Sequence, residues 1–112
     1  MNLLRTTVTE NGGWWEAKLL DLKIVADGAS EQAMLRELEY TLTAEYHLAA
    51  AQGKTPFRDL LTNCPREASK IWEDDGKKFR SLNLSQEVSV ALAAVLERPT
   101  ISAFNVVEAK AA

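Results

Sequence analysis

Residues 30–52 constrain the fold more than any other stretch, because they form a long and strongly periodic pattern. Ser30 can act as an N-cap, since its hydroxyl can accept a hydrogen bond from an amide of the first helical turn. Gly53 and Pro56 indicate where the helix ends. The apolar side chains recur at steps of three and four, which places them on one helix face that requires a partner surface: Leu35, Leu38, Leu42, Tyr46 and Ala49.

The residues before this helix predict that the partner surface is an antiparallel sheet. Residues 3–9 and 14–20 alternate apolar and polar side chains, as half-buried strands do. The Asn-Gly-Gly sequence at 11–13 predicts a hairpin turn between them, since Asn and Gly tolerate positive φ. A third short strand is expected over residues 22–26, closed by the Asp-Gly pair at 27–28. The predicted fold class is α+β, with a three-stranded antiparallel sheet packed on one long helix.

Trp14 and Trp15 lie beside the hairpin and allow two interpretations. Their rings could stack on nucleic-acid bases, or they could pack under the helix and against a sheet edge or a dimer contact. Stacking platforms normally combine aromatic rings with flanking basic residues, and no basic residue flanks this pair. Packing is therefore the favoured interpretation, and whether each ring belongs to the core or to an interface stays open.

The second half of the chain predicts further helical elements. Residues 57–76 are expected to form a helical connector, with Thr55 as cap and Pro56 in the first turn. Residues 77–112 predict a strand, a helix capped by Ser85, and a last helix. The apolar positions of the last two helices are spaced by three or four: Val88, Leu92, Val95 and Leu96, then Ile101, Phe104 and Val107. A segment this short cannot bury both helices alone, so it needs the first lobe or a second copy.

Composition and cysteine content exclude several protein classes. Apolar residues make up 46% of the 112 residues, which is enough for a core and excludes intrinsic disorder. The net charge of −3 argues against a protein that binds nucleic acid over its whole surface. Cys64 is the only cysteine, so no disulfide within the chain and no cysteine metal site is expected. The start lacks a signal-peptide pattern and no apolar run approaches roughly 18 residues, so a cytoplasmic location is expected.

No residue pattern in the chain indicates catalysis. His47 is the only histidine, and its neighbours one helical turn away offer no metal ligands. Asp21 and Asp27 could in principle hold a divalent cation as paired carboxylates, but turn chemistry also explains both. Glycine-rich phosphate loops and nucleophile elbows are lacking from the sequence. We therefore expect no catalytic residues, no bound metal and no cofactor, and we predict that the protein is not an enzyme.

Residues 3–56 resemble the HicB antitoxin family. The resemblance rests on the order of the elements and on four motifs: the Asn-Gly-Gly hairpin, Trp14-Trp15-Glu16-Ala17, Asp27-Gly28-Ala29-Ser30, and Gln52-Gly53-Lys54-Thr55-Pro56. It implies a truncated ribonuclease H-like lobe without catalytic carboxylates, which binds a small basic HicA-like ribonuclease toxin and covers its active site. The acidic balance of the chain suits such a partner. The acidic residues of the helix would be available for toxin binding: Glu31, Glu37, Glu39 and Glu45.

The tail of the chain is similar to ribbon-helix-helix repressors, in which two copies pair their strands into a ribbon that enters the major groove. This resemblance implies dimerisation through apolar residues of the tail: Leu82, Leu84, Val88, Leu92, Phe104 and Val107. It implies base contacts by Phe79, Ser81 and Asn83, and phosphate contacts by Lys77, Lys78, Arg80 and the amides near Ser102 and Ala103.

These observations lead to one division of the chain and two hypotheses for its function. The expected segments are a HicB-like lobe at 1–56, a helical connector at 57–76 and a dimerising, DNA-binding tail at 77–112. In the first hypothesis the protein is an antitoxin that forms a homodimer or a higher even oligomer, masks a ribonuclease toxin and can repress its own operon through the tail. In the alternative it is a non-catalytic inhibitor, for example from a phage or mobile element, which reuses a HicB-like lobe without binding DNA.

Overall fold

The computed structural model describes residues 2–62, 77–96 and 104–110, and in these residues the chain is α+β. Five strands form one sheet in the order β3-β2-β1-β5-β4. The strands are β1 (Asn2–Asn11), β2 (Trp14–Leu19), β3 (Val25–Gly28), β4 (Lys77–Leu82) and β5 (Phe104–Lys110). The pair β1–β5 is parallel, and the other neighbouring pairs are antiparallel.

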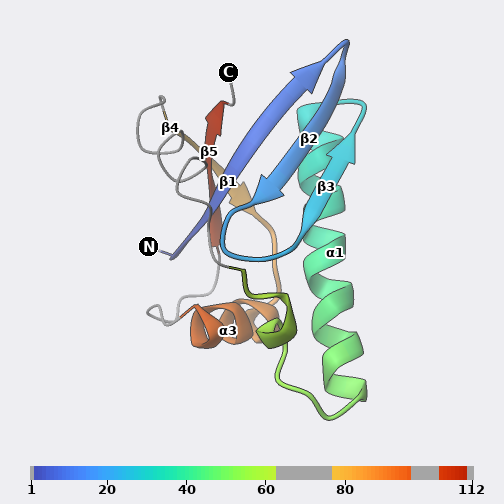
Figure 1. Cartoon of the computed structure of the whole chain (residues 1–112), viewed down its shortest axis with the longest axis vertical. Coiled ribbons are helices and arrows are strands. Elements are labelled where there is room, and N and C mark those ends of the chain that lie inside the picture. Colours follow the sequence, from blue (N-terminus) through green and yellow to red (C-terminus); the bar gives the residue numbers. More distant parts are fainter. Residues whose placement is uncertain (1, 63–76, 97–103, 111–112) are drawn as a thin grey trace.

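Within the described residues, two helices and one short turn pack around this sheet. They are α1 (Glu31–Ala51), the 3₁₀ turn η1 (Arg58–Leu60) and α3 (Gln86–Val95). Figure 1 shows α1 running along β2 and β3, and α3 lying across the lower end of the sheet. The main core lies where α1, α3 and the sheet meet, and its most buried side chains include Leu4, Leu22, Leu38, Leu82 and Leu92.

The predicted β1–β2 hairpin is confirmed. Asn11 pairs with Trp14, and the two residues between them have positive φ, +60° at Gly12 and +84° at Gly13. Two-residue loops with positive φ at both positions match the right-handed twist of paired strands, which is why glycine serves here. The predicted alternation also holds in β1, where Leu4, Thr6 and Val8 are buried. Local turn chemistry and a period of two therefore position this hairpin.

The predicted long helix is confirmed with almost the same bounds. The Ser30 hydroxyl accepts a hydrogen bond from the Ala33 amide at 3.1 Å, which satisfies an orphan donor of the first turn. Leu38 and Leu42 are fully buried as expected, and Met34, which the sequence analysis did not include, is buried with them. The inner face of α1 packs on the sheet. Only the side chains on the other faces of α1 are therefore available to bind another molecule.

Two predicted elements of the first 62 residues differ from the structure. The third strand begins at Val25 rather than at residue 22, because the segment before it is an irregular loop. Leu22 is buried in that loop and bridges to Leu61. Of the helical connector expected over residues 57–76, the structure describes residues 57–62. Only the single turn η1 forms there, because Phe57 adopts φ +67°, which an α-helix cannot continue. Residues 63–76 lie outside the described residues. Phe57 is 2% exposed, so burial of its ring accompanies this backbone conformation.

The prediction of a last helix was wrong, and the tail is not strand-helix-helix. β5 occupies residues 104–110 and lies between β1 and β4, so its backbone pairs on both sides. The three-residue spacing of Phe104 and Val107 suggested a helix, but a window this short does not separate helix from strand. β4 pairs with β5 of the same chain, whereas the ribbon interpretation required a second copy. The strands of the tail therefore extend the sheet of residues 1–56.

Candidate interaction surface

The four acidic residues predicted to bind a toxin do not share one surface of α1. Glu31 forms an ion pair with Arg80 of β4, and the Glu39 carboxylate accepts a hydrogen bond from the backbone amide of Asn83. Both glutamates therefore hold α1 against β4 and the residue that follows it. Glu45 is half-buried and lines a small hollow of about 90 Å³ near η1. Only Glu37 is exposed on the outer side of the helix.

That outer side carries a second row of apolar side chains, which the sequence analysis missed. The row, here called the outer strip, consists of Tyr40, Ala44, Leu48 and Ala51, spaced by four, four and three residues. Tyr40 is 70% exposed and Leu48 is 54% exposed. Aromatic and large apolar side chains that line up on an exposed helix face are typical of binding surfaces. The same periodicity that predicted the inner face could have revealed the strip, since both faces repeat at steps of three and four.

The structure describes some of the side chains that were predicted to contact DNA, and these do not all face the same way. The Arg80 side chain pairs through its Nε with Glu31 of α1 and is 35% exposed. The Ser81 and Asn83 side chains are exposed. The strand β4 begins with Lys77, Lys78 and Phe79. Two further predicted positions, Ser102 and Ala103, lie outside the described residues.

The apolar tail residues predicted to form a two-chain core are buried within one chain. Leu82 is 1% exposed and Leu84 is 8% exposed, and Val88 and Leu92 are fully buried in the same cluster as Leu38. α1 and β1 fill the role that the prediction gave to a second copy. Two further residues predicted to form the dimer interface, Phe104 and Val107, lie in β5.

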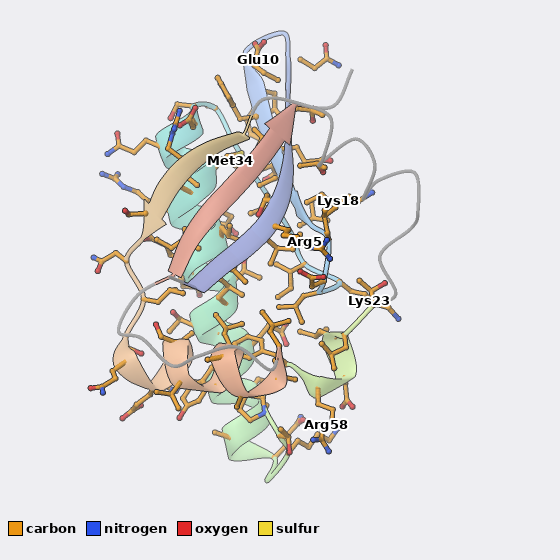
Figure 2. All side chains as sticks on the ribbon, turned by 90° about the vertical axis from the view of Figure 1, so that its left-hand side faces the viewer. Arg5, Glu10, Lys18, Lys23, Met34 and Arg58 are labelled. Carbon is orange, nitrogen blue, oxygen red and sulfur yellow. The ribbon has the colours of Figure 1, made fainter. Side chains whose placement is uncertain are left out.

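Among the described side chains of β1, β2 and β3, most of those on the sheet face opposite α1 are polar. Figure 2 shows Arg5, Lys18 and Lys23 on this side, away from the helix. Trp14 is 52% exposed, whereas Trp15 is half-buried against the second core cluster near Met34. The packing interpretation thus fits Trp15, and Trp14 remains an exposed ring at the hairpin end.

Asp21 holds Arg5, and this pair ties the loop after β2 to β1. The two side chains form a bidentate contact, with Nη2–Oδ1 at 2.5 Å and Nε–Oδ2 at 3.2 Å. The backbone adds a bond from the Leu20 amide to the Arg5 carbonyl at 2.9 Å. Asp27 lies elsewhere, exposed on β3 and opposite Glu16 in the strand register. The two aspartates considered as a metal pair therefore have separate surroundings.

We expect Asp21→Asn to lower the free energy of unfolding by about 1 kcal/mol, because it removes one charge of a partly exposed pair. Urea denaturation of the wild type, Asp21→Asn, Arg5→Met and the double variant gives the coupling energy between the two side chains. Asp27→Asn serves as the control, since Asp27 is exposed. A coupling energy of zero would show that the contact does not stabilise the fold.

Within residues 2–62, 77–96 and 104–110, no three His, Cys, Asp or Glu side chains come together in a way that could hold a metal ion. His47 is exposed, and its ring lies edge-on to Tyr46 with 5.3 Å between the ring centres. Cys64 lies outside the described residues.

In the described part of the chain, no helix is long and apolar enough to cross a membrane. A scan of the sequence against models of known protein families finds no match, and neither do searches of curated proteins and of solved structures.

Proposed function

We propose that the protein is a non-catalytic, antitoxin-like inhibitor that acts in the cytoplasm, where it binds a small basic ribonuclease and masks its active site. The resemblance of residues 3–56 to the HicB family is the starting point. The first part of the sheet agrees with this resemblance in its order, because the antiparallel β1–β2–β3 meander is followed by the long helix α1. The sheet is then extended by β5, which is parallel to β1. β4, which precedes β5 in the chain, is added at the edge of the sheet.

The outer strip is the observation that carries this proposal. It presents a phenol ring and a leucine side chain, more than half exposed, on a helix that the core holds rigidly through Met34, Leu38 and Leu42. Glu37 lies beside the strip and can pair with a basic residue of the partner. Apolar anchors surrounded by charge are the usual composition of a protein–protein interface.

The position of the tail favours an inhibitor that does not use a ribbon-helix-helix module. β4 pairs with β5, and Arg80 pairs with Glu31, so the strand predicted to enter a DNA groove is part of the monomer sheet. This observation favours the alternative hypothesis over autorepression through the tail. A toxin-binding protein of this kind needs no operator contact to protect the cell.

We expect Tyr40→Ala and Leu48→Ala each to weaken toxin binding at least about tenfold, since central aromatic and apolar anchors dominate interface energies. The experiment co-expresses the tagged protein with the product of the small reading frame beside its gene. Co-purification and rescue of growth are measured, and titration of the purified pair gives the dissociation constant.

Val25→Ala is the matched control, because Val25 is 48% exposed but lies on β3, away from the outer strip. Val25→Ala should bind as the wild type does. Stoichiometric binding with loss in the two strip variants would support the proposal. A neighbour that is neither toxic nor bound would contradict the antitoxin function, and unchanged binding in both strip variants would exclude α1 as the docking surface.

A further inference from the structure

A shallow groove of about 560 Å³ lies between the C-terminal part of α1 and α3, on a different side of α1 from the outer strip. Its floor is built from small and apolar side chains of both helices: Tyr46, Ala50, Val90, Ala91 and Ala94. Val90 is 39% exposed, and Ala50 and Ala94 are also exposed. Alanines on both walls allow another helix to approach closely.

The composition of α3 favours a groove that another surface covers. After Gln86 and Glu87 the helix contains only apolar residues and Ser89. Among the described residues, the buried side of α3 is that of Val88, Ser89, Leu92 and Ala93. The other side carries Gln86 and Glu87 in the first turn, followed by Val90 and Ala94, which are exposed. Exposed apolar residues on a helix this rich in apolar side chains are typical of a face that packs against a partner.

The charges at the rim identify the occupant. Lys54, in the segment that follows α1, and Glu87 of α3 both line the groove. Within the described residues, no ion pair involves either side chain. A purely basic partner would satisfy Glu87 and leave Lys54 against like charge. A second copy turned by a two-fold axis presents Glu87 where Lys54 needs an anion and Lys54 where Glu87 needs a cation, which is the self-complementarity of an isologous interface.

We propose that the α1–α3 groove is the homodimer interface of this protein, with Lys54 of each copy opposite Glu87 of the other. This surface replaces the shared strand-and-helix core that the sequence predicted. It does not rest on the proposed function, because the dimer forms without a toxin and uses the other side of α1.

The test is a charge exchange in the full-length protein. We expect the wild type to dimerise with increasing concentration in sedimentation velocity. Glu87→Lys and Lys54→Glu should each raise the dimer dissociation constant at least about tenfold, because each places like charges across the interface. The double variant Lys54→Glu/Glu87→Lys should restore the dimer, since the pair is reformed with its charges exchanged.

Two further variants keep the test decisive if an exchange variant folds poorly. Val90→Glu places a carboxylate in the apolar floor and should prevent dimerisation, whereas Val25→Glu, on β3, should leave it intact. Circular dichroism checks that each variant is folded. Restored association in the double variant together with loss of the dimer in Val90→Glu supports the interface. Where an exchange variant does not fold, loss of the dimer in Val90→Glu with an intact dimer in Val25→Glu supports it. A monomeric wild type, a folded double variant that stays monomeric, or a dimer that survives Val90→Glu overturns it. Tyr40→Ala should not change the dimer, so failure of this interface and failure of toxin binding are distinguishable.

Discussion

Leu38→Ala is expected to lower the free energy of unfolding by about 2–5 kcal/mol, the largest effect of any substitution considered for this chain. Leu38 is fully buried at the centre of α1, in the cluster that joins the sheet, α1 and α3. Truncation removes apolar contacts and leaves a cavity that the surrounding elements cannot fill. Since small domains are stable by only about 5–15 kcal/mol, this loss is a large fraction of the total.

Leu48→Ala is the matched control, with the same chemical change on the same helix. Leu48 is 54% exposed on the outer strip, so its truncation should change stability by no more than about 0.5 kcal/mol. Urea denaturation followed by tryptophan fluorescence measures both variants. Equal losses in the two variants would mean that α1 is not oriented as described. Under the proposed function Leu48→Ala also weakens toxin binding at least about tenfold, so one variant separates the proposed binding role of α1 from its structural role.

The sequence predicted the elements whose signals are local. The β1–β2 hairpin depends on two glycines with positive φ, and α1 depends on a cap at Ser30 and a regular apolar period. Each signal lies within a few residues of the structure that it specifies. These elements could therefore be predicted without knowing what they pack against.

The sheet could not be predicted in full, because its central pairing is not local. Asn2 pairs with Phe104 in the parallel ladder between β1 and β5. The sequence of residues 104–110 does not indicate that β1 has an edge with which these residues can pair. Without that information, apolar residues three apart were assigned to a helix. A period read from seven residues is compatible with either structure, and tertiary pairing decides between them.

The residues predicted to bind a toxin also depend on contacts that are not local in the sequence. The sequence places Glu31 and Glu39 on α1 but does not reveal that Arg80 and the Asn83 amide lie beside them. Such partners come from residues more than forty positions away, and they decide which carboxylates are available to another protein. The outer strip, in contrast, was readable from the sequence as a second period on the same helix.

Gly28→Ala is expected to destabilise the protein by about 1–3 kcal/mol, because an added methyl group would overpack a site with no space. A Cβ at this position would lie 2.6 Å from the Met34 amide nitrogen and 2.9 Å from the Ala33 carbonyl carbon. These are backbone atoms of the first turns of α1, so they cannot rotate away as a flexible side chain would. Either β3 or the start of α1 must shift, and both carry core residues, Ala26 of β3 in the main cluster and Met34 of α1 in the second.

Gly12→Ala separates this steric cost from the ordinary cost of replacing a glycine. Nothing lies within 4 Å of a Cβ at Gly12, but its φ of +60° is unfavourable for alanine by about 1–2 kcal/mol. Gly12→Ala should therefore affect only the hairpin, whereas Gly28→Ala should also increase hydrogen exchange at the amides of the first turn of α1. Hydrogen exchange of both variants tests this difference. Unchanged stability and unchanged exchange in Gly28→Ala would mean that α1 does not approach β3 closely, and the rigid support inferred for the outer strip would be lost with it.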